Sequence, residues 1–190
     1  MRPQGSPEEV RQHARQVLAM AEDPQPGDEV SVRELLLAAA TSRRAAGDVD
    51  EAVDLLRRAS QEPDGAWLDV RGDLHRLLLS EGREEDARAL AHELRRQRPT
   101  PAFALGDVAG NLWAQGHLEE AHRWYTLAAS RLLGELESGA PSPEQRALTT
   151  VLAARAELRA EMDLPADELD ELGGELDAED LDALDDDLEG

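Results

Sequence analysis

The sequence of 190 residues contains no cysteine, so it forms no disulfide and offers no thiolate to a metal. Aromatic residues make up only 3 % of the chain, which indicates a core built from leucine and alanine. No apolar run approaches the roughly 18 residues that a membrane-spanning helix needs. The first residues also contain no apolar region of the kind found in signal peptides. We therefore expect a cytoplasmic protein.

Lysine is absent as well, and all 20 basic residues are arginine, as a GC-rich genome would favour. The net charge is −22 and is unevenly distributed. Residues 161–190 contain 15 acidic residues and no basic one, and subtracting these 15 charges leaves −7 for residues 1–160. Because a nucleic-acid-binding protein needs a basic face for the phosphates, we expect no direct binding of nucleic acid.

Three short segments share one pattern, in which a glycine stands five residues before an alanine with acidic residues between them. The segments are Gly47 to Ala52, Gly82 to Ala87 and Gly116 to Ala121. Their glycines lie 35 and then 34 residues apart, a period typical of helical repeats. Glycine can adopt the left-handed backbone that ends a helix, and acidic residues favour the start of the next one. The pattern therefore predicts three helical hairpins whose alanines allow close packing.

Helical periodicity supplies the expected helices around these turns. The predicted pairs cover residues 30–46 with 49–61, 66–81 with 84–97, and 102–115 with 118–136. Capping boxes beginning at Ser6 and Ser142 predict one further helix on each side, over 7–22 and from 143 onwards. The expected organisation is a capping helix and loop (1–28), three repeats (29–136), a closing helix (137–163) and an acidic, disordered tail (164–190).

With this pattern the chain resembles the tetratricopeptide repeat (TPR) family over about residues 33–135, and it is similar to small TPR proteins of GC-rich bacteria. A small residue seven positions after the first alanine is present as Ala59 and Ala128, and Tyr125 occupies the aromatic position. The resemblance implies an all-α, TPR-type α-solenoid, a right-handed superhelix of hairpins. It also implies a non-enzymatic scaffold without cofactors that binds a protein or peptide in a concave groove.

The family's groove is lined by fixed positions of the first helix of each repeat, and the resemblance places the following residues there. They are Glu34, Leu37, Thr41, Arg44, Asp69, Asp73, Arg76, Leu79, Phe103, Asp107 and Trp113. The family's clamp for chaperone tails needs lysine and asparagine at several of these positions, so this class of partner is excluded. Trp113 has two open interpretations: it is either an exposed binding anchor or a core residue between helices.

Sites for chemistry are scarce in the sequence. His117 and His122 are five residues apart, which differs from the i, i+4 spacing of a helical zinc pair. No glycine-rich phosphate loop and no nucleophile elbow is present. We therefore expect no enzymatic activity and no metal site.

The acidic tail consists of two similar twelve-residue segments with leucines at helical spacing. These leucines are Leu169, Leu172, Leu176, Leu181, Leu184 and Leu188. The like charges and the pair Gly173 and Gly174 oppose a stable free helix, so the tail is expected to be disordered with latent helicity. It either keeps the protein soluble or folds onto a basic, apolar surface, on a partner or on the protein's own groove near Arg44 and Arg76. An alternative function is an acidic antagonist whose tail mimics nucleic acid on a basic partner.

Overall fold

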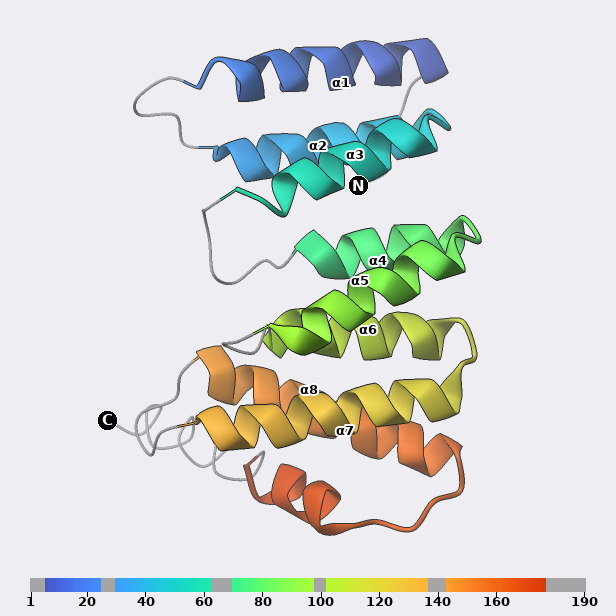
Figure 1. Ribbon diagram of the computed structural model, residues 1–190, viewed down its shortest axis with the longest axis vertical. Coiled ribbons are helices and arrows are strands. Elements are labelled where there is room, and N and C mark those ends of the chain that lie inside the picture. The colour runs from blue at the N-terminus through green and yellow to red at the C-terminus, as the bar shows by residue number, and fades with distance from the viewer. Residues whose placement is uncertain (1–5, 25–29, 63–69, 98–101, 137–142, 177–190) are drawn as a thin grey trace, which may run out of the picture. The chain divides into compact units, whose positions relative to one another are not determined.

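The structure is a computed structural model, and it describes residues 6–24, 30–62, 70–97, 102–136 and 143–176 (Figure 1). All regular secondary structure in these ranges is helical. The chain forms two compact units, Met1–Arg88 and Ala89–Gly190, which are taken in turn below. The expectation of an all-α protein of helical hairpins is confirmed.

The first unit contains α1 (Pro7–Glu22), α2 (Val32–Ala45), α3 (Val49–Ala59), α4 (Val70–Ser80) and the start of α5 (Glu84–Arg96). In Figure 1, α1 lies along α2, and α2 lies along α3. Ser6 and Glu9 form the predicted capping box at the start of α1. A second capping box, formed by Ser31 and Glu34, opens α2.

A half-buried aspartate, Asp48, ties α1 to the first hairpin. Arg11 on α1 donates two hydrogen bonds from Nε and Nη2 to the carboxylate of Asp48, at 2.9 and 3.0 Å, and a third to the carbonyl of Ala46. Arg43 on α2 pairs with the same carboxylate at 3.1 Å. These hydrogen bonds, led by the one from Arg11, lower the pKa of Asp48. The ion pairs and the apolar face of α1 together hold this helix against the first hairpin.

The second unit contains the rest of α5, then α6 (Ala102–Ala114), α7 (Leu118–Glu135), α8 (Pro143–Glu161) and a helical segment over residues 168–176. α6 and α7 form an antiparallel pair, and α8 packs on both of them (Figure 1). Fully buried leucines fill the space between these helices: Leu105, Leu132, Leu148, Leu152 and Leu158. The unit is therefore a leucine-rich helical stack, as the shortage of aromatic residues predicted.

The three glycines of the repeated pattern have the predicted left-handed backbone, with φ of +84° at Gly47, +69° at Gly82 and +79° at Gly116. At each turn the residue after the glycine donates its N–H to a carbonyl five residues earlier, as from Arg83 to Leu78 at 2.8 Å. This pairing is a Schellman motif, which satisfies the last carbonyls of a helix. The alanines five residues after the glycines are almost fully buried.

Gly82→Val should therefore lower the melting temperature by several degrees, because an L-residue at φ +69° is strained by about 1–2 kcal/mol and a β-branched one by more. The matched control is Gly134→Val. Gly134 lies in α7, has no positive φ, and a Cβ added there would meet nothing within 4 Å. Thermal melts followed by circular dichroism check the difference, and equal melting temperatures for the two variants would contradict the left-handed turn.

A fourth hairpin is present that the sequence did not predict. α8 ends at Glu161 and is followed by a turn at Asp163, whose φ is +55°. The N–H of Leu164 donates to the carbonyl of Arg159 at 2.9 Å, in the same Schellman pairing as at the three glycine turns. The chain then continues into the helical segment 168–176. α8 and residues 168–176 thus repeat the turn geometry of the three predicted hairpins.

This hairpin differs from the expectation of a single closing helix followed by disorder from residue 164. The helix runs through Gly173 and Gly174, which were expected to interrupt it. Its stability comes from packing on α8 and from ion pairs, which a charge count over the tail alone does not reveal. Residues 177–190, the second twelve-residue segment, lie outside the described residues.

Candidate binding surface

In the first unit, the predicted groove residues of α2 and α4 are largely accessible. Thr41 and Arg44 are exposed on α2, and Arg76 is exposed on α4, where it pairs with the half-buried Asp73. Glu34 is exposed but already engaged, because its carboxylate accepts hydrogen bonds from the backbone N–H and the hydroxyl of Ser31 at 2.8 and 2.9 Å. The backbone hydrogen bond from Ser31 lowers the pKa of Glu34. Asp69 lies outside the described residues.

In the second unit, the predicted groove residues lie on α6. Phe103 is 37 % exposed and Asp107 is exposed. Trp113 is half-buried, and its indole N–H donates to Glu161 of α8 at 2.7 Å. Its ring also meets Tyr125 edge-on with centroids 6.4 Å apart. Trp113 is therefore partly a packing residue between α6, α7 and α8, and Phe103 is the more accessible aromatic ring.

Two buried arginines on α8 form the densest polar cluster among the described residues. The side chain of Arg155 is only 2 % exposed, and its guanidinium reaches Asp167 and Asp170 at 2.6 Å each. Arg159 pairs with the same two carboxylates, at 3.1 Å to Asp167 and 2.8 Å to Asp170. Thr126 of α7 accepts a further hydrogen bond from Arg155 at 2.9 Å. The cluster fastens the start of the acidic tail to α8 and α7.

The same aspartates also cap the helical segment they begin. The backbone N–H groups of Leu169 and Asp170 donate to Oδ1 of Asp167, and the N–H of Asp167 donates to Oδ2 of Asp170 at 3.0 Å. This reciprocal pattern corresponds to a capping box. The hydrogen bond from Arg155 is the main reason why the pKa of Asp167 is far below its usual value. Both carboxylates thus have two roles: they pair with the arginines of α8 and they cap the helical segment 168–176.

His122 lies at the edge of this cluster, with Nε2 3.2 Å from Nη1 of Arg159. Burial lowers the pKa of His122, and the positive charges of Arg155 and Arg159 lower it further. These effects favour the neutral imidazole, although the carboxylates of Asp167 and Asp170 raise the pKa of His122 in opposition. Within the part of the chain that the structure describes, no three histidine or carboxylate side chains are arranged to hold a metal.

Three of the six tail leucines lie in the described residues, and these three are half-buried. Leu169, Leu172 and Leu176 are half-buried in the described helical segment, whereas Leu181, Leu184 and Leu188 lie outside the described residues. Arg155, Arg159 and Asp163 were not among the predicted site residues. The sequence did contain signals for the turn and helix that these residues help to form. Aspartate, as at Asp163, is one of the few residue types besides glycine that tolerate a positive φ, and Asp167 and Asp170 have the spacing of a capping box.

His75 in the first unit has the clearest pH dependence. It is only 2 % exposed, and burial lowers its pKa to about 4 from the ordinary 6.5. The folded state therefore prefers neutral histidine, so its contribution is complete above pH 6.5 and is lost as the pH falls towards 4. The shift corresponds to stability on the order of 3 kcal/mol.

His75→Gln should consequently make the free energy of unfolding less dependent on pH between 6.5 and 4.5 than in the unmodified chain. Urea unfolding at a series of pH values measures this slope. His13→Gln, which replaces an exposed histidine on α1, is the control. Identical slopes for His75→Gln and the unmodified chain would contradict the assignment.

Comparison with protein families supports the repeat pattern, because residues 43–106 match the family described as tetratricopeptide repeat. This stretch runs from the end of α2 into α6 and contains the first two glycine turns. The match covers about a third of the chain and shows that this part is similar to tetratricopeptide repeats. TPR repeats generally mediate interactions between proteins and are typically non-enzymatic modules. No curated protein matches the chain. None of the described helices combines the length and apolar character needed to cross a bilayer.

Proposed function

We propose that this protein is a non-enzymatic adaptor that binds a protein or peptide segment on the first helices of its repeats. In the first unit this surface consists of Thr41 and Arg44 on α2 with Asp73 and Arg76 on α4. In the second unit it consists of Phe103, Asp107 and Trp113 on α6. The surface carries charged and aromatic side chains, and exposed arginine and aromatic residues are favoured as binding anchors.

The observation that carries this proposal is the contrast between buried and exposed residues along α2. Leu36, Ala39 and Ala40 are buried in the hairpin, while Thr41 and Arg44 remain exposed at positions that bind partners in the family. Among the described residues, Arg44 forms no ion pair between α2 and α3, whereas Arg43 pairs with Asp48 and Glu51. The helix therefore separates a structural arginine from one available to a partner.

A peptide library displayed on phage and selected on the immobilised full chain tests the proposal. Selected peptides should lose at least tenfold in affinity for the double variant Arg44→Ala and Arg76→Ala. The matched control is Arg57→Ala and Arg58→Ala, which removes two exposed arginines from α3. Selection of no peptide, or equal losses in both variants, would contradict binding at the first helices.

The alternative of a tail that mimics nucleic acid receives less support. Asp167 and Asp170 are already paired with Arg155 and Arg159, so the first part of the tail has its charges engaged within the fold. If the acidic tail modulates binding, residues 177–190 are the part that does so. Deleting residues 164–190 would not test this cleanly, because it would also remove the second helix of the fourth hairpin.

A further inference from the structure

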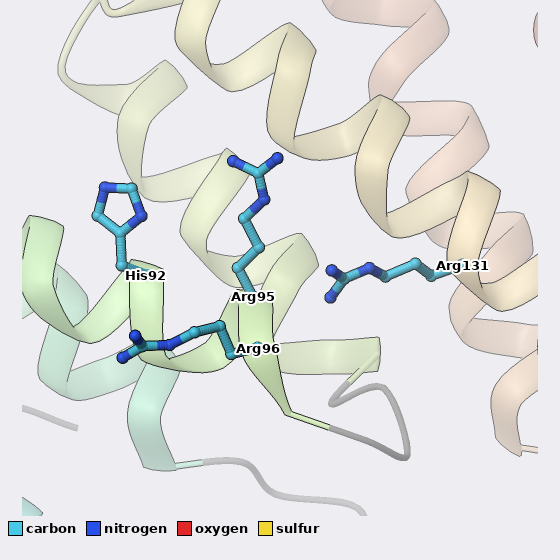
Figure 2. A pocket seen from close by; sticks show the side chains of 4 residues that line it. All are labelled: His92, Arg95, Arg96 and Arg131. Atoms are coloured by element: carbon cyan, nitrogen blue, oxygen red, sulfur yellow. The ribbon is translucent and has the colours of Figure 1, made fainter.

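The second unit has a cationic hollow on its second helices. The hollow has a volume of about 710 Å³ and is lined by His92, Arg95 and Arg96 from α5 and by Arg131 from α7 (Figure 2). Figure 2 shows the guanidinium of Arg131 reaching from α7 toward the end of α5. Among the described residues that line the hollow, none is acidic. A cluster of this kind is unusual in a chain whose net charge is −22.

Helix stability alone explains only part of this arrangement. Arg95 and Arg96 stand in the last turn of α5, where positive charge is favoured by the helix dipole. Arg131 enters the same hollow from α7, so two helices contribute positive charge to it. His92, Arg95 and Arg96 are exposed, and no ion pair between described residues uses Arg95 or Arg96. The hollow therefore presents positive charge to an anionic ligand.

We propose that this hollow binds the acidic C-terminal segment of the same chain, residues 177–190. The segment contains 8 acidic residues and no basic one, together with Leu181, Leu184 and Leu188. Its charge complements that of the arginines, and carboxylates form charge-assisted hydrogen bonds with guanidinium groups. A free anionic ligand would be repelled by the net charge of −22, whereas the attached segment is always nearby.

Chain connectivity favours this occupant as well. The described helical segment ends at residue 176 in the same unit as the hollow. Fourteen further residues can span up to about 45 Å when extended. Because the segment is joined directly to residue 176, it stays near this unit at an effective concentration of roughly millimolar. Weak individual ion pairs then suffice for substantial occupancy.

This inference goes beyond the proposed adaptor function and is independent of it. The hollow is built from second helices, α5 and α7, whereas the proposed partner surface is built from first helices. The sequence suggested tail docking near Arg44 and Arg76, but Arg76 pairs with Asp73 on its own helix. Docking at the hollow would leave the first-helix surface open to a partner and would shield the arginines from other anions.

The absence of lysine allows a specific cross-linking test in the full chain. Arg95→Lys introduces the only side-chain amine, and a carbodiimide joins it directly to a carboxylate in contact with it. Peptide mass spectrometry should find position 95 linked to acidic residues within 177–189 in the monomer, independent of protein concentration. The matched control, Arg58→Lys, places an amine at another exposed arginine, on α3, and should give at least fivefold less of this product.

A second variant tests whether the cross-link depends on the charges of the hollow rather than on chance encounters of position 95 with the tail. Adding Arg96→Glu and Arg131→Glu to Arg95→Lys should reduce the cross-link at least fivefold while circular dichroism shows unchanged helix content. High salt should reduce it too, because exposed charges are screened. Cross-links only to Glu93, equal yields in the Arg58→Lys control, or products only between molecules would each overturn the proposal.

Discussion

Replacing both Asp167 and Asp170 by asparagine is expected to lower the free energy of unfolding by about 3–5 kcal/mol. The change leaves Arg155 and Arg159, both buried on α8, without any negative partner in the cluster. Asparagine still caps helices well, so the loss reports on charge rather than on capping. For a chain of this size the melting temperature should fall on the order of 10 °C.

The matched control for this variant is Asp50→Asn with Asp54→Asn. These aspartates are 97 % and 73 % exposed and pair with Arg83 and Arg57 on the surface. Exposed pairs contribute less than about 1 kcal/mol each. Urea unfolding measures both double variants, and equal losses would show that the arginines on α8 do not need the tail carboxylates. Adding Arg155→Met and Arg159→Met to the first variant should recover much of the lost stability.

The second large effect is expected at Gly173, where residues 168–176 approach α8 closely. A Cβ built on Gly173 would stand 3.1 Å from Cβ of Leu152, so Gly173→Leu must push the two helices apart. Overpacking of this kind costs about 1–3 kcal/mol. The neighbouring Gly174 is exposed and a Cβ there would meet nothing within 4 Å. Gly174→Leu should therefore stabilise the helix by about 0.5–1 kcal/mol through helix propensity.

Urea unfolding of the two single variants provides the comparison. The substitutions are chemically identical and adjacent in sequence, so their difference depends only on which face of the helix meets α8. Opposite signs are expected for Gly173→Leu and Gly174→Leu. Equal changes in stability would contradict the docking of residues 168–176 on α8.

The sequence was sufficient for the three hairpins because their signals are local. Gly47, Gly82 and Gly116 mark turns that need a positive φ, and the observed helices begin and end within a few residues of the predicted ranges where the structure describes them. The predicted helix 7–22 agrees with α1 at both ends. Apolar periodicity and caps act over one or two turns, so they can be recognised without knowledge of the tertiary structure.

The fourth hairpin was missed because its determinants are not local. Asp163 replaces the glycine of the pattern, and the spacing from Gly116 is 47 residues instead of 34 or 35. Arg155 and Arg159 belong to the predicted closing helix, and both are buried in ion pairs with carboxylates 8 to 15 residues further along the chain. A run of like charges suggests disorder unless the opposite charges that it meets are known.

For the candidate binding surface, the sequence predicted which helix positions its residues occupy but not which side-chain contacts they make. The repeat period placed Thr41, Arg44 and Arg76 on first helices, where the structure shows them exposed. The capping-box pattern from Ser31 to Glu34 was present in the sequence and was missed, whereas the hydrogen bond from Trp113 to Glu161 joins distant side chains that no local pattern indicates. The cationic hollow joins α5 to α7, residues that are 35 or more positions apart, and no short sequence pattern indicates it.

Amide hydrogen exchange over residues 168–176 tests most directly the central claim that the acidic tail begins as the second helix of a fourth hairpin. The account predicts that the amides of residues 172–176 exchange far more slowly than in a free peptide of the same sequence, and that this protection is lost in the Asp167→Asn and Asp170→Asn variant. Exchange at the rate of the free peptide, with α8 still protected, would contradict it.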